Sequence, residues 1–410
     1  MSRTLITIAL LSLTQTALAD DFYVNTTDVD NDGSCDVLTE TTDCTLIEAI
    51  LIANENPGST DVVHLQTGVK YSLTEAWSDE TAFPTIYSTV IIKGQGSESI
   101  IQRPTDGTAD TFRMFKVHET GRLVLSRVTI RGGHSETNGG AILNAGTLGL
   151  RNAVLDDNTA EANGGAIAST GSVYIKHSTL QYNSAEGSGG AISIQADDDT
   201  RVRINRSTLY ANTAYDIDGT GGGGAVYMTG DAHTILSETT FSGNETEGLG
   251  GALYFFAPDT RDARMRNLTV VDNAAAEAGG IYMDATGQSA EVQLSNSIIS
   301  LNTGDNPDLC VDVCVADETF ISLGGNVVQN GRDAVSAHML DLYDEVVGLL
   351  PFTVATMPLG ADEAGTGHHP ITRSSNATAR GIVGSAAPRD QLAQPRTPGP
   401  VDAGSVRALD

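Results

Sequence analysis

The segment DVDNDGSCD has the residue types and spacing of an acidic calcium-binding loop. Carboxylates stand at positions 1, 3, 5 and 9 of such a loop, and Gly33 stands at position 6. Alternate carboxylates can converge on a hard cation, and the glycine lets the chain turn around it. Position 12 is Thr39 rather than a bidentate glutamate. A calcium site and a plain acidic loop both stay open, and both concern Asp28, Asp30, Asp32 and Asp36.

Basic residues at one position of a repeated pattern could act on an acidic polysaccharide. Counted back from a recurring asparagine, Arg151, Lys176 and Arg266 occupy the same position of their units. A polysaccharide lyase needs a Lys or Arg to remove the C5 proton of a uronate, and further cations to neutralise its carboxylate. Arg151 and Lys176 belong to consecutive units, so we expect them to be neighbours on an outer face. The alternative is that they are solvated charges on an exposed strand.

The sequence gives less evidence for a glycoside hydrolase. Asp156 and Asp157 could form the carboxylate pair of such an enzyme, but adjacent residues of a strand point to opposite faces.

The cysteines form two close pairs, which in an exported protein favour local disulfides over a zinc site, since no His lies near either pair. The predicted bridges are Cys35–Cys44 and Cys310–Cys314.

The first 19 residues resemble a secretory signal peptide. Arg3 precedes the apolar run LITIALLSL, and Ala17-Leu18-Ala19 fits a signal-peptidase site, so we expect cleavage before Asp20. No later stretch is apolar enough to cross a membrane as a helix. The sequence thus predicts a secreted or cell-surface protein without a transmembrane anchor.

The charge of the chain is strongly negative. The net charge is −29, and loss of Arg3 with the signal peptide would make it −30. Such a protein should repel nucleic acids, anionic membranes and polyanionic sugars unless cations mediate the contact. We therefore expect no nucleic-acid partner, and we expect the protein to be a monomer.

A repeat must position these residues. Glycine pairs followed by small or apolar residues recur at intervals of 25, 25, 34, 27 and 29 residues. Later in each unit stands a second motif, which consists of an apolar residue, two variable residues and an asparagine. The pairs begin at Gly139, Gly164, Gly189, Gly223, Gly250 and Gly279, and the asparagines are Asn158, Asn183, Asn212, Asn244, Asn273 and Asn302. The segment RLVLSRVTIRGG is an earlier, degenerate copy with glycine in place of the asparagine.

The repeat predicts an all-β right-handed parallel β-helix, a solenoid in which each unit is one coil of three short strands. Apolar residues alternate within each unit, which is the period of a strand rather than of a helix. Glycine permits positive φ at tight corners, and asparagine tolerates the left-handed conformation and can bond from coil to coil. We therefore expect Asn183 and its equivalents to be structural corner residues rather than catalytic ones.

A helical N-terminal cap is predicted at DCTLIEAILIAN. Asp43 or Thr42 could begin the helix, Glu48 lies in an early turn, and an apolar face follows. That face consists of Leu46, Ile47, Ile50 and Ala53.

Several of these motifs resemble known bacterial families. Cys44, Leu46, Glu48 and Ala49, with the upstream FYVNTT, resemble the domain named for its CSLREA signature, and Ile47 replaces the usual Arg. The repeats of residues 121 to 305 resemble those of polymorphic outer-membrane proteins, surface-exposed β-helices of which several are adhesins. The end of the chain, from PRDQ onward, resembles the ending of secreted bacterial β-helices. The resemblance implies fold, export and surface exposure, and residues 350–410 do not show the strands of an autotransporter barrel.

The sequence predicts four regions. They are a signal peptide (1–19), a strand, acidic loop and capping helix (20–60), the parallel β-helix (61–345) and an irregular C-terminal loop or cap (346–410). The function that we predict is that of a non-catalytic exported β-helix protein, presenting a surface to a cell-surface or extracellular glycan or protein. The alternative is a carbohydrate-active enzyme, such as a calcium-assisted lyase with Arg151 and Lys176 in its groove. Calcium is the single cofactor predicted.

Overall fold

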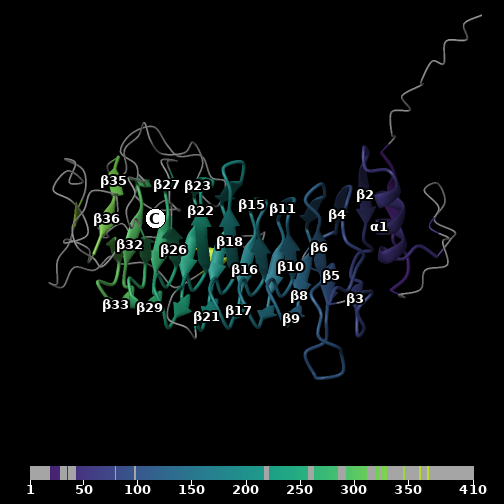
Figure 1. Ribbon diagram of the computed structural model, residues 1–410, viewed down its shortest axis with the longest axis horizontal. Coiled ribbons are helices and arrows are strands. Elements are labelled where there is room, and N and C mark those ends of the chain that lie inside the picture. Colours follow the sequence, from purple (N-terminus) through teal and green to yellow (C-terminus); the bar gives the residue numbers. More distant parts are fainter. Residues whose placement is uncertain are drawn as a thin grey trace, which may run out of the picture.

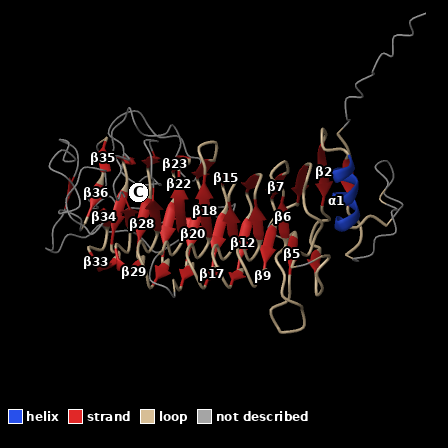
Figure 2. Cartoon of the chain, viewed as in Figure 1, coloured by secondary structure: helices blue, strands red, loops and turns tan. Residues whose placement is uncertain are grey.

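The chain is an elongated parallel β-solenoid with one helix at its N-terminal end, as a computed structural model shows (Figures 1 and 2). The structure describes residues 19–27, 35, 43–78, 80–96, 98–216, 221–256, 263–284, 292–311, 320–323 and 325–329, and the pairs 345–346, 360–361 and 367–368. The predicted fold is confirmed, including its right-handed parallel coils.

Four parallel sheets run along the solenoid, and we name them A to D in the order in which one complete coil, such as β11 to β14, passes through them. Sheet A consists of β1 (Asp21–Tyr23), β2 (Thr60–His64), β4 (Thr89–Lys93), β7 (Arg122–Ser126), β11 (Thr147–Arg151), β15 (Ser172–Lys176), β19 (Arg201–Asn205), β23 (His233–Ser237), β27 (Ala263–Arg266), β31 (Val292–Ser295) and β35 (Phe320–Ser322). Sheet B consists of β3 (Lys70–Ser72), β5 (Ile100–Gln102), β8 (Thr129–Arg131), β12 (Val154–Asp156), β16 (Thr179–Gln181), β20 (Thr208–Tyr210), β24 (Thr240–Ser242), β28 (Thr269–Val271), β32 (Ile298–Ser300), β36 (Val327–Val328) and β37 (Glu345–Val346).

The other two sheets are smaller. Sheet C consists of β9 (His134–Ser135), β13 (Thr159–Ala160), β17 (Ser184–Ala185), β21 (Thr213–Ala214), β25 (Glu245–Thr246), β29 (Ala274–Glu277) and β33 (Thr303–Asp305). Sheet D consists of β6 (Phe115–Val117), β10 (Ile142–Asn144), β14 (Ile167–Ser169), β18 (Ile192–Ala196), β22 (Val226–Gly230), β26 (Leu253–Phe256), β30 (Ile281–Asp284) and β34 (Leu309–Val311). In the predicted C-terminal region, β38 (Gly360–Ala361) and β39 (Gly367–His368) form an antiparallel pair.

A coil has four strand segments where the sequence predicted three. The coil formed by β11, β12, β13 and β14 is followed by β15, β16, β17 and β18, each paired with its predecessor. The additional segment, in sheet C, is only two residues long in most coils, which is too short for an alternating pattern to reveal it. The alternating apolar residues do point inward as expected. Leu148, Val173 and Val202 align across β11, β15 and β19, and all three are fully buried.

The glycine pairs make the corner before sheet D. In five pairs the first glycine has a φ between +68° and +74°, a conformation that side chains with a Cβ rarely adopt. A Cβ on the second glycine would overlap backbone; at Gly165 it would meet the carbonyl oxygens of Gly190 and Ser184. The sixth pair was placed one residue too late in the sequence. Register puts Ala278 (φ +51°) at the first position and Gly279 at the second.

The recurring asparagines form a ladder inside the solenoid. From Asn158 to Asn302 each side-chain Nδ2 donates to Oδ1 of the asparagine in the next coil, at 2.8 to 2.9 Å. The backbone N–H of each donor residue reaches the same oxygen at 3.0 to 3.1 Å. Bonding from coil to coil is thus confirmed. The expected left-handed conformation of these asparagines is wrong, because the preceding residue adopts it, for example Tyr182 with φ +54°. That turn directs the asparagine side chain inward.

The helix α1 (Leu46–Glu55) packs against β2 and β4 at the N-terminal end of the solenoid. Its predicted apolar face is buried. The predicted start at Thr42 or Asp43 is wrong, since the N-cap is Thr45. Its Oγ1 accepts from the Glu48 backbone N at 3.1 Å, and Glu48 Oε2 accepts from the Thr45 backbone N at 3.0 Å, which completes a capping box.

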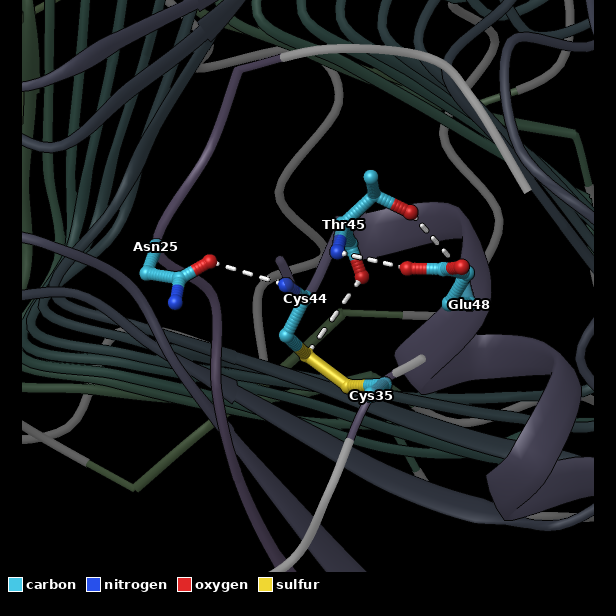
Figure 3. The surroundings of a disulfide bond; sticks show 5 residues. All are labelled: Asn25, Cys35, Cys44, Thr45 and Glu48. Atoms are coloured by element: carbon cyan, nitrogen blue, oxygen red, sulfur yellow. Dashed lines mark hydrogen bonds between the residues drawn. A yellow bond between two sulfur atoms is a disulfide. The ribbon is translucent and has the colours of Figure 1, made fainter. Parts of the chain in front are cut away.

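The Cys35–Cys44 disulfide lies directly before this helix (Figure 3). The backbone N of Cys44 donates to Asn25 Oδ1 at 2.8 Å, and the backbone N of Asn25 donates back to the Cys44 carbonyl oxygen at 3.1 Å. The chain after β1 is thereby held against the start of α1. Because these bonds fix residue 44 outside the helix, the helix begins only after Thr45.

Candidate functional site

The outer face of sheet A is the surface on which the predicted Arg151 and Lys176 lie. In its five-residue strands the second and fourth residues point into the core, and the first, third and fifth point outward. Because the strands pair in register, the outward residues form three rows along the solenoid axis. Arg151 lies directly beside Lys176, as predicted, and Arg266 lies in the same row beyond Asn205 and Ser237.

This face carries positive charge alone. On β4, β7, β11, β15, β19, β23, β27 and β31 there are eight Lys or Arg residues and no Asp or Glu. The eight are all exposed, and they lie on six of these eight consecutive strands, in a chain that has 23 basic and 52 acidic residues. We call this surface the basic face, defined by Lys93, Arg122, Arg151, Lys176, Arg201, Arg203, Arg264 and Arg266.

The basic residues in the centre of the face are available to a ligand. No described carboxylate forms an ion pair with Arg122, Arg151, Lys176, Arg201 or Arg203. Like charges on adjacent strands repel one another, and a bound anion would relieve that repulsion.

A depression of about 290 Å³ lies in the centre of the basic face. Its floor is formed where Val124, Gly149 and Tyr174 stand side by side in the third-residue row. Gly149 has no side chain to fill this place; a Cβ there would lie 3.3 Å from Val124 Cγ2. Cations surround the floor on both sides and at one end: Arg122, Arg151, Lys176 and Arg203.

This arrangement is suited to a flat anionic ligand. Arg guanidinium groups bind carboxylate or sulfate in a bidentate manner, and Lys176 adds a compact charge. The Tyr174 ring, partly buried, offers an apolar face with a polar hydroxyl at its edge. The described lining residues include no Asp, Glu, His or Cys, so they do not provide carboxylate or imidazole metal ligands.

Sequence reasoning found two residues of this site and missed Arg122, Gly149, Tyr174 and Arg203. The signal was present, because RLVLS, TLGLR, SVYIK and RVRIN align without gaps when counted back from the asparagine ladder. Their third letters give Val, Gly, Tyr and Arg, which is the row that forms the depression and continues to Arg203. The fifth position is basic in two consecutive units, whereas the third position changes residue type in every coil and shows no pattern of its own.

The carboxylates Asp156 and Asp157 do not form a catalytic pair. Asp156 is buried on sheet B, where it accepts from Arg131 Nε at 2.6 Å and from Gln181 Nε2 at 3.1 Å. Asp157 follows in the left-handed conformation (φ +54°), which turns its side chain away from the strand. Desolvation, followed by the neighbouring Asp156 carboxylate, raises the pKa of Asp157. Both residues belong to the corner between sheets B and C rather than to a groove.

The remaining predicted sites fall partly outside the described residues. The calcium loop residues Asp28, Asp30, Asp32 and Asp36 lie there, and calcium binding stays a prediction. Elsewhere in the described part of the chain, no group of three or more His, Cys, Asp or Glu side chains is arranged to hold a metal ion. Cys310 is disulfide-bonded, but Cys314 lies outside the described residues, so that pairing stays a prediction.

A comparison with known protein families supports the fold described for the coils. Residues 152–331 match the family model described as right handed beta helix region. The match supports the right-handed β-helix fold of the coils that it covers. The match begins in the coil that contains Arg151 and Asn158 and covers the later coils as far as β36. No curated protein matches the sequence significantly. Among the described helices, none is long and apolar enough to cross a membrane.

Proposed function

We propose that this β-helix protein is exported and binds an acidic glycan on the basic face of sheet A. The observation that carries the proposal is a face of eight consecutive strands with eight exposed cations and no carboxylate, in an otherwise acidic protein. An acidic protein gains no general solubility from such a face, and a local positive field selects anionic partners. Export rests on the predicted signal peptide and would place the face at the cell surface or outside the cell.

An extended glycan fits the shape of the face better than a small anion does. The cations extend from Lys93 on β4 to Arg266 on β27, along the direction in which coils repeat about every 4.8 Å. A chain with one charge per sugar unit could contact several of them at once. The depression at Gly149 would hold one sugar ring against Tyr174, with its carboxylate or sulfate facing Arg151 and Lys176.

Nucleic acid is a weaker candidate for the same surface. The protein as a whole has a net charge of −29, so a stiff, highly charged duplex that extends beyond the face would meet repulsion. The depression is also lined by one aromatic ring, Tyr174, and offers no second ring for stacked bases.

A polysaccharide lyase is the second candidate function. One observation favours it: Tyr174 and Lys176 point from the same strand into the depression, next to Arg151. There Lys176 could take the C5 proton of a uronate, Arg151 could neutralise the carboxylate, and the Tyr174 hydroxyl could protonate the departing oxygen. Binding without cleavage is the simpler proposal, because the cations extend well beyond this one depression.

The test is a binding screen with wild-type protein and two double variants. Immobilised polygalacturonate, alginate, heparan sulfate and neutral glucans serve as probes. We expect binding to one or more acidic glycans, and at least about tenfold weaker binding for Arg151→Ala/Lys176→Ala, since two charge-assisted contacts are lost.

The matched control is Lys70→Ala/Lys116→Ala, which removes two exposed lysines from β3 and β6 and should leave binding unchanged. Equal binding to neutral glycans, or equal affinity of both double variants, would refute the proposal. The ultraviolet absorbance of unsaturated sugar products, which only an eliminating enzyme forms, separates the lyase from the binding protein.

A further inference from the structure

A buried carboxylate lies at the N-terminal end of the solenoid. Asp61 is the second residue of β2, and its side chain points inward with only 1% of the residue exposed. One carboxylate oxygen, Oδ2, accepts a hydrogen bond from Ser59 Oγ at 2.6 Å. An ionised carboxylate in such a place is costly unless a cation or several donors compensate it.

The other carboxylate oxygen faces the backbone nitrogen of Asp20. The distance from Asp20 N to Asp61 Oδ1 is 2.9 Å. The Asp20 carbonyl oxygen accepts from the Val62 backbone N, also at 2.9 Å, and the next residues form β1 on the edge of β2. Two bonds on opposite sides of residue 20 thus direct its nitrogen toward the carboxylate.

No cation is available to Asp61 from the neighbouring parts of the chain. Among the described residues, no Lys, Arg or His forms an ion pair with it. The segment 28–42, which follows β1, contains no Lys, Arg or His at all. In the unprocessed chain, the group that meets Asp61 is a neutral peptide N–H.

The nitrogen that contacts Asp61 is the one that the predicted signal cleavage would free. We propose that hydrolysis of the Ala19–Asp20 bond creates an α-ammonium group that forms a buried ion pair with Asp61 and fixes β1 to the solenoid. Water adds across the peptide bond, Ala19 leaves with a carboxylate, and the Asp20 amine takes up a proton, because α-amino groups have a pKa near 8. The proposal rests on export and on the position of the cut, and not on glycan binding.

The ion pair would matter most for the first strand. β1 is three residues long and has a partner on one edge only, so it should open more readily than the strands within the sheet. A charge-assisted bond at Asp20, the residue before β1, would hold one end of this strand, as the Cys44–Asn25 bonds hold the chain after its other end. Processing would thus make the end of the solenoid more resistant to opening than it is in the precursor.

Two proteins that differ by one residue test the proposal. One begins at Asp20 and the other at Ala19, each released from a fusion by a protease that leaves no extra residue. Both keep the Asp20 N–H near Asp61, but only the first places the ammonium there, since Ala19 is exposed. Hydrogen exchange of the amides of residues 22–27 and of the Val62 amide should be roughly tenfold slower in the protein that begins at Asp20.

Removal of either charge should abolish the difference. The substitution Asp61→Asn in both proteins should make their exchange rates equal. Acetylation of the Asp20 amine should do the same, and it cannot disturb the fold of β2. Equal exchange in the two unmodified proteins, or a difference that persists after acetylation, would overturn the proposal, as would an exported protein whose first residue is not Asp20. Glycan binding measured in parallel should be the same for both proteins, so failure here leaves the proposed function standing.

Discussion

The asparagine ladder and the basic face both run along the solenoid axis, yet they use repetition in opposite ways. Six coils contribute the same residue to the ladder, each at most 5% exposed and bonded to the next. On the basic face the outward rows change from coil to coil, for example Val124, Gly149, Tyr174 and Arg203 in succession. Repetition therefore marks contact between coils, and variation marks a surface whose partner lies outside the chain.

The physical cause of this difference is the environment of each side chain. A buried amide must satisfy its donors and acceptor inside the protein, and the identical amide one coil away does so in one geometry. An exposed side chain meets water, which accepts any polar group, so folding places no constraint on its identity. A cluster of like charges on the surface costs free energy through mutual repulsion, and a bound ligand of opposite charge would offset that cost. The basic face therefore indicates an anionic ligand.

The largest effect should follow from a change at the repeated corner. Gly165→Ala places a Cβ against the backbone carbonyls of Gly190 and Ser184, neither of which can move without breaking coil pairing. We expect about 3 kcal/mol or more of lost stability, measured by urea unfolding. The control is Gly149→Ala on the basic face, where the added methyl would meet the Val124 side chain at 3.3 Å rather than backbone and should cost less than about 1 kcal/mol. Equal costs at the two glycines would contradict the comparison.

The next effect concerns the ladder itself. Asn183→Ala removes an amide that accepts from Asn158, donates to Asn212 and to the Leu155 carbonyl oxygen, and leaves its neighbours unsatisfied. We expect about 2 kcal/mol of destabilisation in the same unfolding measurement, with ligand binding retained by the folded fraction. Asn205→Ala removes a partly buried asparagine of sheet A whose Nδ2 donates to Ser237 Oγ at 2.8 Å and to the Ser237 carbonyl oxygen at 3.5 Å, and it should cost under about 1 kcal/mol. Loss of binding without loss of stability in Asn183→Ala would make the ladder functional.

A smaller effect is predicted for the acidic loop, whose sequence is not repeated. If Asp28, Asp30, Asp32 and Asp36 hold calcium, a chelator should lower the melting temperature by about 2–4 °C, and Asp30→Ala should abolish that response. Differential scanning calorimetry with and without chelator measures it. An unchanged melting curve would reject a structural calcium site. A positive result would show that a residue cluster present once can stabilise the fold as the repeated ones do.

The smallest effect on stability is expected on the basic face. Arg151→Ala/Lys176→Ala should change the free energy of unfolding by less than about 0.5 kcal/mol, because both side chains are exposed and relief of repulsion offsets any lost packing. Urea unfolding of this variant beside wild type gives the value. Destabilisation comparable with that of Asn183→Ala would mean that the basic residues serve the fold, and it would remove the main argument for a ligand.

The sequence by itself determined the architecture, because the architecture depends on contacts between equivalent positions of successive coils. Glycine pairs, asparagines and alternating apolar residues recur for that reason, and they were sufficient to predict a parallel β-helix and to make Arg151 and Lys176 neighbours. The capping helix was found from its apolar face, although its first residue was placed too early. Nothing local in the sequence records that the disulfide and Asn25 hold Cys44 outside the helix.

Only the tertiary structure decided where charge gathers and which polar groups meet. The net charge predicted repulsion of acidic sugars, whereas stacking of the coils gathers eight cations on one face and excludes carboxylates from it. The left-handed residue before each ladder asparagine, the two-residue strands of sheet C and the contact between Asp20 and Asp61 were likewise absent from the sequence analysis. Each depends on which side chains the coiling brings within a few ångströms of one another across 25 to 41 residues of chain, and composition and periodicity do not carry that information.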